Sequence, residues 1–456
     1  MSRYRNLSGV LFGAAALLAG CGGGGSAPPV GGPPTDATPE IQTFVSDKAG
    51  YLVGERATLT VRFSGGTGRI DPLPGPVQSG VPIETDPLDS SRELRLVVES
   101  PRGTVSRSLT LTVQYRDRYR DTGNVLRSRG HTATLAGDGS VIVIGGSRGL
   151  SILSSSIDRF DPRTGNFAPI GNLANGREGH RTVRLANGKL LVVGGETVLA
   201  DWRAELVDER TGAVEPAGMP SVPRYSHSAV ALPDGRVLIA GGFTTGEGAG
   251  FGISRSAEIW DPARRVFRRL AATMRIARAG HGASVLPDGR VLVAGGFSED
   301  GNYEFAEIFD PATETFSVAA AVDNRQRGNL GVALLPDGSV LMMGGESAQA
   351  EPSAAVQRFR ATGFDVLAGL VRSRTFTEPV VLRDGRVLLF GGEIGPGNLT
   401  TETAESYSAA NGGFPIASLP EPRVGLTATR LSDGRVLIVG GESANGALIP
   451  AVLVYE

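Results

Sequence analysis

The chain has 456 residues, and 45 lysines and arginines against 47 aspartates and glutamates give it a formal net charge of −2. This balance lacks the excess of positive charge that attracts nucleic acid, so we expect no nucleic-acid partner. The single cysteine, Cys21, excludes a disulfide within the chain and a thiolate metal cage.

The first twenty residues predict a secretion signal. Arg3 and Arg5 precede the apolar run "LSGVLFGAAALLAG", which ends directly before Cys21. The letters "LAGC" at 18–21 resemble a bacterial lipobox, and this resemblance implies cleavage before Cys21 and lipidation of its sulfur. Acyl chains on one cysteine anchor a protein without a spanning helix. We therefore expect a lipoprotein of the bacterial cell envelope, in the outer membrane on its periplasmic or surface side; an ordinary signal peptide is the alternative.

Residues 21–39 consist mainly of Gly, Pro, Ala, Ser and Thr, a composition that predicts a flexible tether. From 40 to 116 the sequence alternates apolar and polar residues, as in "ATLTVRFSGG" (57–66) and "RELRLVVES" (92–100), which predicts β-strands. The run "GYLVGERATLTV" (50–61) resembles the start of an immunoglobulin-like domain of bacterial surface proteins. That resemblance implies a disulfide-free β-sandwich, which we expect to act as a spacer.

Residues 117–456 repeat one sixteen-residue motif, exemplified by "HSAVALPDGRVLIAGG" and "HGASVLPDGRVLVAGG". The seven copies end at Gly146, Gly195, Gly242, Gly296, Gly345, Gly392 and Gly441. The central Asp-Gly or Asn-Gly favours a two-residue hairpin turn, and the flanking runs are apolar on both faces, as in strands covered on both sides. A third run with an aromatic residue and often Asp-Pro, as in "SAEIWDPARRVF" (256–267), leads to a fourth strand.

Four-stranded units of this kind bury both faces only by packing around an axis. The Gly-Gly pair, the aromatic-Asp-Pro turn and the later aromatic residue resemble the kelch repeat. This resemblance implies an all-β chain with a seven-bladed kelch-type β-propeller over 117–456. The fifth and sixth units lack Asp-Pro. The last unit ends after its third strand, so we expect residues 118–126 to pair with 450–456 and close the ring, which removes two sheet edges.

The first residue of each motif copy, here called the head, begins the innermost strand and is expected at one mouth of the central channel. The four histidines of the chain are all heads, namely His131, His180, His227 and His281. Six units carry an arginine three residues before the head, namely Arg177, Arg224, Arg278, Arg327, Arg374 and Arg423. These arginines either hold loop carbonyls of adjoining units or form a cationic mouth for a carboxylate, sulfate or acidic sugar.

Aromatic residues occur in loops on the same face. Tyr225, Phe243, Phe251, Phe297 and Tyr303 belong to this group. Aromatic residues beside arginines suit sugar rings or a protein hot spot, although loop tips also pack onto their own unit. We predict a ligand-binding mouth composed of the arginines and histidines named above together with Tyr225 and Tyr303.

We predict no catalytic residue, cofactor or metal. Histidines in successive units are spread around a channel, with no acidic residue at ligand spacing. Copper radical oxidases of kelch type need a tyrosine cross-linked to a cysteine, and Cys21 belongs to the lipid anchor. We therefore expect a monomeric lipoprotein whose propeller binds a protein or a glycan at the cell surface. The alternative is a propeller hydrolase, lyase or epimerase acting on an acidic sugar.

Overall fold

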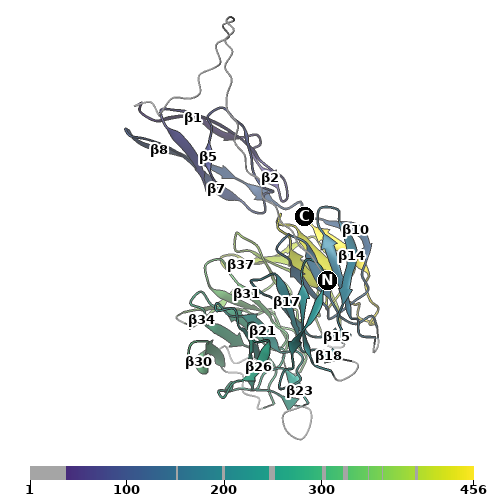
Figure 1. Ribbon diagram of the computed structural model, residues 1–456. Coiled ribbons are helices and arrows are strands. Elements are labelled where there is room, and N and C mark those ends of the chain that lie inside the picture. Colours follow the sequence, from purple (N-terminus) through teal and green to yellow (C-terminus); the bar gives the residue numbers. More distant parts are fainter. Residues whose placement is uncertain are drawn as a thin grey trace, which may run out of the picture.

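A computed structural model describes residues 37–149, 152–197, 201–245, 252–299, 305–321, 327–347, 349–361, 363–395 and 399–456. The predicted signal, Cys21, most of the tether, Phe251 and Tyr303 lie outside these residues. All regular elements in the described ranges are β-strands, and none of these residues belongs to a helix able to cross a membrane. The strands form a small N-terminal domain and a larger domain beside it (Figure 1).

The N-terminal domain has two main sheets, in the strand orders β1-β3-β6 and β5-β4-β7-β8, and a short parallel pair of β2 with β9. Its strands are β1 (Glu40–Ser46), β2 (Tyr51–Leu52), β3 (Thr58–Ser64), β4 (Thr67–Asp71), β5 (Pro76–Val77), β6 (Ile83–Glu84), β7 (Arg92–Ser100), β8 (Gly103–Leu111) and β9 (Val113–Gln114). Phe44 and Leu59 from one sheet and Ile70 and Leu96 from the other share one buried core. This domain is therefore built from two sheets around a common core, and its immunoglobulin-like character stays a prediction.

The larger domain consists of four-stranded antiparallel sheets, of which the described residues form seven. Numbered from 1 to 7 in chain order, they are β11 (Thr132–Leu135), β12 (Val141–Ile144), β13 (Ser156–Asp161) and β14 (Asn166–Asn172); β16 (Arg181–Arg184), β17 (Lys189–Val193), β19 (Ala204–Asp208) and β20 (Val214–Gly218); β21 (Ser228–Ala231), β22 (Val237–Ala240), β25 (Ala257–Asp261) and β26 (Val266–Arg269); β27 (Gly282–Val285), β28 (Val291–Ala294), β29 (Phe305–Asp310) and β30 (Thr315–Ala321); β31 (Gly331–Leu334), β32 (Val340–Met343), β33 (Val356–Arg360) and β34 (Gly363–Leu367); β35 (Val380–Val381), β36 (Val387–Phe390), β37 (Ala404–Ser408) and β38 (Gly412–Ile416); and β39 (Thr427–Arg430), β40 (Val436–Val439), β41 (Ala451–Tyr455) and β10 (Tyr119–Val125). Two short antiparallel strand pairs accompany sheets 2 and 3, namely β15 (Arg177–Glu178) with β18 (Glu196–Thr197) and β23 (Phe243–Thr244) with β24 (Gly252–Ile253).

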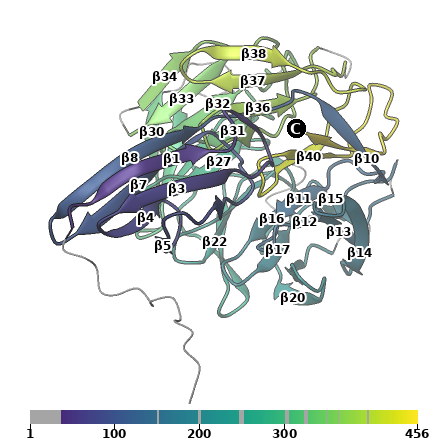
Figure 2. The same ribbon diagram turned by 90° about the horizontal axis from the view of Figure 1, so that it is seen from above.

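These sheets surround a common axis. The first strand of each sheet contacts the first strand of the next in the cyclic order β11, β16, β21, β27, β31, β35, β39 and back to β11. The last strands, such as β14, β20, β34 and β38, lie on the outside (Figure 2). The all-β, propeller-type arrangement predicted from the repeats is therefore present.

The repeated turn and glycine signals act locally as expected. In sheet 3, Gly235 of the Asp-Gly turn has a φ of 88°, and its N–H donates to the Leu232 carbonyl at 2.9 Å. Gly242 ends β22 with a φ of 93°, and a Cβ atom there would lie 2.7 Å from the Tyr225 carbonyl oxygen. Glycine is therefore needed at Gly242 for both its backbone conformation and the close approach of the preceding loop.

The predicted pairing of 118–126 with 450–456 is present. Tyr119 lies opposite Tyr455 and Val125 opposite Ala451 in the β10–β41 ladder. The N–H of Leu126 extends the pairing by donating to the Pro450 carbonyl at 3.0 Å. Sheet 7 therefore joins two segments from opposite ends of the larger domain.

The N-terminal domain docks on the face that carries the Asp-Gly turns. Its buried Asp89 forms ion pairs with Arg430 at 2.5 Å and with Arg383 at 2.8 Å. The Tyr115 hydroxyl donates to the carbonyl of Gly434, in the Asp-Gly turn of sheet 7, at 2.5 Å. Because the heads lie at the other end of the same strands, the channel mouth formed by the heads faces away from this domain (Figure 1).

Candidate functional site

The six repeated arginines lie inside the sheets rather than on the rim of the channel. Each is at most 4% exposed and donates to the carbonyl of the first glycine in the Gly-Gly pair of its own sheet, as Arg224 does to Gly241 at 2.7 Å. The other five donations are Arg177 to Gly194, Arg278 to Gly295, Arg327 to Gly344, Arg374 to Gly391 and Arg423 to Gly440. Four of the arginines also pair with a buried glutamate of the third strand, namely Arg177 with Glu205, Arg224 with Glu258, Arg278 with Glu307 and Arg374 with Glu405.

Two of the six have other partners in the third strand. Arg327 donates to the Gln357 side chain at 2.5 Å, and Arg423 donates to the Ala451 carbonyl at 3.1 Å. The positive charge expected at the mouth is therefore enclosed, because these guanidinium groups bind the loop after Gly-Gly to the third strand. Their assignment as ligand-binding residues stays a prediction.

Three of the four histidines connect neighbouring sheets. In each, Nε2 lies within hydrogen-bond distance of a hydroxyl on the residue that follows the head of the preceding sheet. The pairs are His131 with Thr427 at 2.9 Å, His180 with Thr132 at 3.1 Å and His281 with Ser228 at 2.8 Å. Burial lowers the pKa of His131 to about 4 and, with help from the nearby arginines, lowers the pKa values of His180 and His281 to about 3. These imidazoles are therefore neutral near pH 7.

His227 is the exception among the histidines. It is fully buried, yet neither ring nitrogen has a hydrogen-bond partner among the residues that the structure describes. The preceding sheet carries Arg181 where the sheets before the other three histidines carry a hydroxyl, and Arg181 Nε donates to the His227 backbone carbonyl at 2.9 Å instead of engaging the ring.

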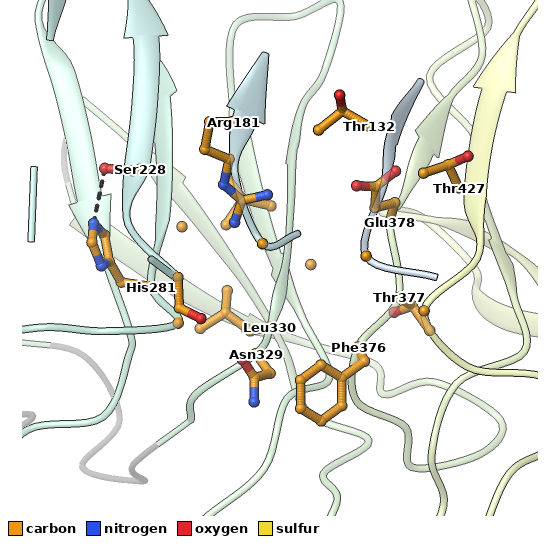
Figure 3. Close-up of a pocket in the computed structure, with 18 of the residues that line it drawn as sticks. Thr132, Arg181, Ser228, His281, Asn329, Leu330, Phe376, Thr377, Glu378 and Thr427 are labelled. Atoms are coloured by element: carbon orange, nitrogen blue, oxygen red, sulfur yellow. Dashed lines mark hydrogen bonds between the residues drawn. The ribbon is translucent and has the colours of Figure 1, made fainter. Parts of the chain in front are cut away.

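A cavity of about 430 Å³ occupies the head end of the channel, and all seven sheets line it (Figure 3). The position after the head supplies five of its polar side chains, namely Thr132, Arg181, Ser228, Glu378 and Thr427. Sheets 4 and 5 place Gly282 and Gly331 at this position. Other positions supply His131, His180, Ser226, His281, Asn329 and Thr377. The cavity is therefore roomy, and each of the seven sheets contributes at least one polar side chain to its lining.

Arg181 and Glu378 are the two charged groups in this cavity lining. Both are exposed to the cavity, and neither takes part in an ion pair within the described residues. Enclosure by the channel walls raises the pKa of Glu378, although the charge of Arg181 and the backbone N–H of Ala428 act in the opposite direction. A comparison of the residue after the head across the seven copies would have singled out both residues in the sequence.

The residue before the head forms the rim of the cavity and has a left-handed backbone conformation in every sheet. Four sheets use glycine at this position, namely Gly130, Gly179, Gly280 and Gly425. The other three use Ser226, Asn329 and Phe376, with φ values of 50°, 51° and 53°. Phe376 is 43% exposed, and its N–H donates to the Asn329 carbonyl at 3.1 Å. An aromatic side chain therefore stands at the cavity entrance on an unfavourable backbone conformation.

Glutamates supply further charge on this face. Glu346, Glu393 and Glu442 directly follow the Gly-Gly pairs of sheets 5, 6 and 7. Burial raises the pKa of Glu346, and burial together with the charges of Glu346 and Glu442 raises the pKa of Glu393. Arg129 pairs with Glu442 at 3.2 Å. The mouth therefore carries more acidic side chains than the cationic mouth expected from the sequence.

Of the two tyrosines predicted at the mouth, only Tyr225 lies in the described residues. Its ring packs against Phe243 of its own sheet, with ring centroids 5.2 Å apart. The contact matches the packing of loop tips onto their own unit, which the sequence left open as the alternative.

The fold and the channel define a β-propeller with a polar cavity on its axis. Residues 128–174 match the family model for the kelch motif. No curated protein matches the chain. A solved structure described as a novel fungal alcohol oxidase with catalytic diversity among the AA5 family, in complex with copper, has a TM-score of 0.61 and 16% identity, and the match covers 74% of this chain and 75% of that one. The structure of YjhT has a TM-score of 0.50 and 15% identity, with 73% and 96% of the two chains covered. The family match covers one kelch motif, at residues 128–174, and at these identities the structural likeness concerns the β-propeller fold alone.

The residues of this channel do not fit the copper that the fungal oxidase structure contains. Copper in proteins favours imidazole ligands. Here the histidines come from different sheets, and three of them place Nε2 against hydroxyls. Among the described residues, no group of three histidines, cysteines, aspartates or glutamates is arranged to hold a metal ion.

Proposed function

We propose that this chain is a cell-envelope lipoprotein whose kelch propeller binds a protein or a glycan in the cavity at the channel mouth. One observation carries the proposal. Arg181 and Glu378 are exposed in a cavity of about 430 Å³, and no ion pair within the described part of the chain neutralises either of them. Sites for small ligands are typically concave, of this size, and have a few well-placed polar groups.

The architecture we propose for this function is a closed ring of seven blades on a disulfide-free immunoglobulin-like spacer. The cyclic contacts among the seven first strands and the β10–β41 pairing support the ring. The two sheets around one core support the spacer. The sequence at 1–39 supports a lipid anchor at Cys21 and a tether, and we propose that the protein is a monomer that is bound to the membrane only through this anchor.

Binding is tested with purified protein that lacks the first 36 residues, on a glycan array and against envelope proteins by cross-linking from a photoreactive residue placed at Asn329. The matched control for Arg181→Ala is Arg290→Ala, because Arg290 is an exposed arginine that pairs with Asp288 outside the cavity. We expect the Arg181 variant to lose binding and the control to retain it. Failure of the intact protein to bind any glycan or envelope protein would refute the proposal.

The lipid anchor has its own test. In a bacterial host, metabolic labelling with an alkyne fatty acid should mark the wild-type chain and leave Cys21→Ser unlabelled. Membrane fractionation should find the variant in the soluble fraction. Equal labelling of both proteins would contradict the anchor.

The enzyme alternative gains support from Glu378. Its raised pKa is what a general acid needs, since such a carboxyl keeps its proton closer to neutral pH. In this alternative, Arg181 would hold the carboxylate of an acidic sugar beside Glu378 for a hydrolase, lyase or epimerase reaction. Proton NMR of acidic sugars incubated with wild type and Glu378→Gln tests it, because only the wild type should convert the sugar while both should bind it.

A further inference from the structure

Three residues in the cavity depart from the pattern of the repeat, and each departure is unfavourable for the fold. The position after the head follows a simple rule in the other sheets. It carries a hydroxyl where the next head is a histidine, as Thr132 does before His180, and glycine where the next head is Leu330 or Thr377. Residues that break a local rule of the repeat at a cost in stability are candidates for function.

Arg181 is the first departure. It replaces the hydroxyl expected before His227, and the buried imidazole of His227 is left without a hydrogen-bond partner for either nitrogen among the described residues. Burying a polar group without a partner is unfavourable. The guanidinium is nevertheless exposed in the cavity, and its Nε donates to the His227 carbonyl.

Phe376 is the second departure. Residues with bulky side chains rarely adopt a φ of 53°, and four of the seven sheets use glycine at this position. Burial of the ring does not offset the unfavourable backbone conformation, because Phe376 is 43% exposed. Figure 3 shows it beside Asn329 at the end of the cavity opposite Glu378 and Thr132.

Glu378 is the third departure and lies two residues after Phe376 in the same sheet. It stands where the repeat has glycine before a head that is not histidine, here Leu426. Its carboxyl shares the cavity with the guanidinium of Arg181 without forming an ion pair with it. Two opposite charges are therefore held apart in one enclosed space, on sheets 2 and 6.

The charges decide which ligand fits. A neutral ligand would leave both charges uncompensated, and a purely anionic ligand would be repelled by Glu378. A ligand with a carboxylate and an ammonium group satisfies both, since a guanidinium pairs best with a carboxylate and a carboxylate accepts charge-assisted hydrogen bonds from an ammonium group. An apolar side chain between these ends would cover the exposed ring of Phe376.

We propose that Arg181, Phe376 and Glu378 form a recognition site for a short zwitterionic peptide, with its C-terminal carboxylate on Arg181, its N-terminal ammonium on Glu378 and an apolar side chain on Phe376. This inference rests on the proposed binding function of the cavity and names its ligand class. The ligand is the free peptide, because the end of a protein chain presents only one of the two groups.

The test uses isothermal titration calorimetry with leucyl-phenylalanine in its L and D forms, and with versions that are N-acetylated or C-amidated. We expect each modification to weaken binding at least tenfold. The effect of amidation should disappear in Arg181→Thr, and the effect of acetylation should disappear in Glu378→Gln. Peptides that bind after acetylation but not after amidation would indicate a protein C-terminus as the ligand and overturn the zwitterion assignment.

Replacement of the three departing residues supplies a second, ligand-independent readout. Arg181→Thr offers His227 a hydroxyl, Phe376→Gly relieves the left-handed backbone, and Glu378→Gln removes an enclosed charge. We expect each variant to unfold at a higher temperature than wild type and to bind the dipeptide at least tenfold more weakly, while Arg290→Thr leaves binding unchanged. Lower unfolding temperatures in all three would assign these residues to the fold and overturn the inference.

The two proposals fail in different ways. Binding of a glycan or an envelope protein in the cavity, without binding of any dipeptide, would overturn the inference and leave the proposed function standing. Absence of both kinds of ligand would overturn both.

Discussion

The buried histidines make the propeller sensitive to acid, and the size of the effect follows from their pKa values. In the unfolded chain a histidine has its ordinary pKa of 6.5, whereas burial lowers the pKa of His131 to about 4 and that of His281 to about 3. The folded state therefore binds fewer protons between these values. Stability from each histidine is fully present above pH 6.5 and is lost as the pH falls towards the folded pKa.

At pH 5 the unfolded imidazole is almost fully protonated while the folded one is neutral. The pH of 5 lies about 1.5 units below the unfolded pKa of 6.5. At about 1.4 kcal/mol per unit, each histidine therefore lowers the free energy of unfolding by about 2 kcal/mol at this pH. His131, His180 and His281 together should lower the free energy of unfolding by about 6 kcal/mol between pH 7 and pH 5.

The assay is guanidinium chloride unfolding at pH 7, 6 and 5 for wild type and His281→Leu. Leucine is a matched replacement, because Leu330 and Leu426 are heads in sheets 5 and 7. The difference between the two proteins cancels the titrating groups that do not interact with His281. Wild type should lose about 2 kcal/mol more than the variant over this range. Equal losses in the two proteins would refute the reasoning.

Three further predictions concern buried and interfacial charges. Arg278→Ala leaves Glu307 charged and buried, so it should lower the free energy of unfolding by about 3–5 kcal/mol, against less than about 1 kcal/mol for the exposed Arg290→Ala, both measured by chemical denaturation. Asp89→Ala removes the partner of two propeller arginines, and small-angle X-ray scattering should show a wider distribution of domain separations; an unchanged distribution would contradict the docking role. Because the pKa of Glu378 is raised in the folded state, its contribution to stability is lost as the pH rises above its ordinary value of 4.5, so Glu378→Gln should gain stability over wild type above that pH and show no gain below it in thermal unfolding.

The repeats allowed much of the fold to be predicted from the sequence. The Asp-Gly turns and Gly-Gly pairs report backbone requirements that recur in every unit, and the pairing of 118–126 with 450–456 followed from the missing fourth strand of the last unit. The turn and glycine signals are local in the sequence, and each occurs seven times because the unit is repeated. Side-chain contacts between distant residues of one unit leave no comparable pattern in the sequence.

The site was harder to predict because the repeated residues do not form it. An arginine occupies the same position in six units, yet the role of Arg224 depends on Glu258, which lies 34 residues further along the chain and pairs with it inside the sheet. Arg181 and Glu378 occur once each, and only their location in the cavity shows that their charges face each other across a channel. The position of Phe376 on a left-handed backbone is likewise invisible without coordinates.

The docking of the N-terminal domain on the turn face gives the assembly a direction. Attachment through the N-terminal side leaves the opposite opening clear, so a protein immobilised by residues 37–40 on a sensor chip should bind its ligand as it does in solution. In a chain tethered to a lipid bilayer through its N-terminal side, the cavity would open away from the bilayer. It would then be accessible to ligands in the surrounding solution rather than to the lipids.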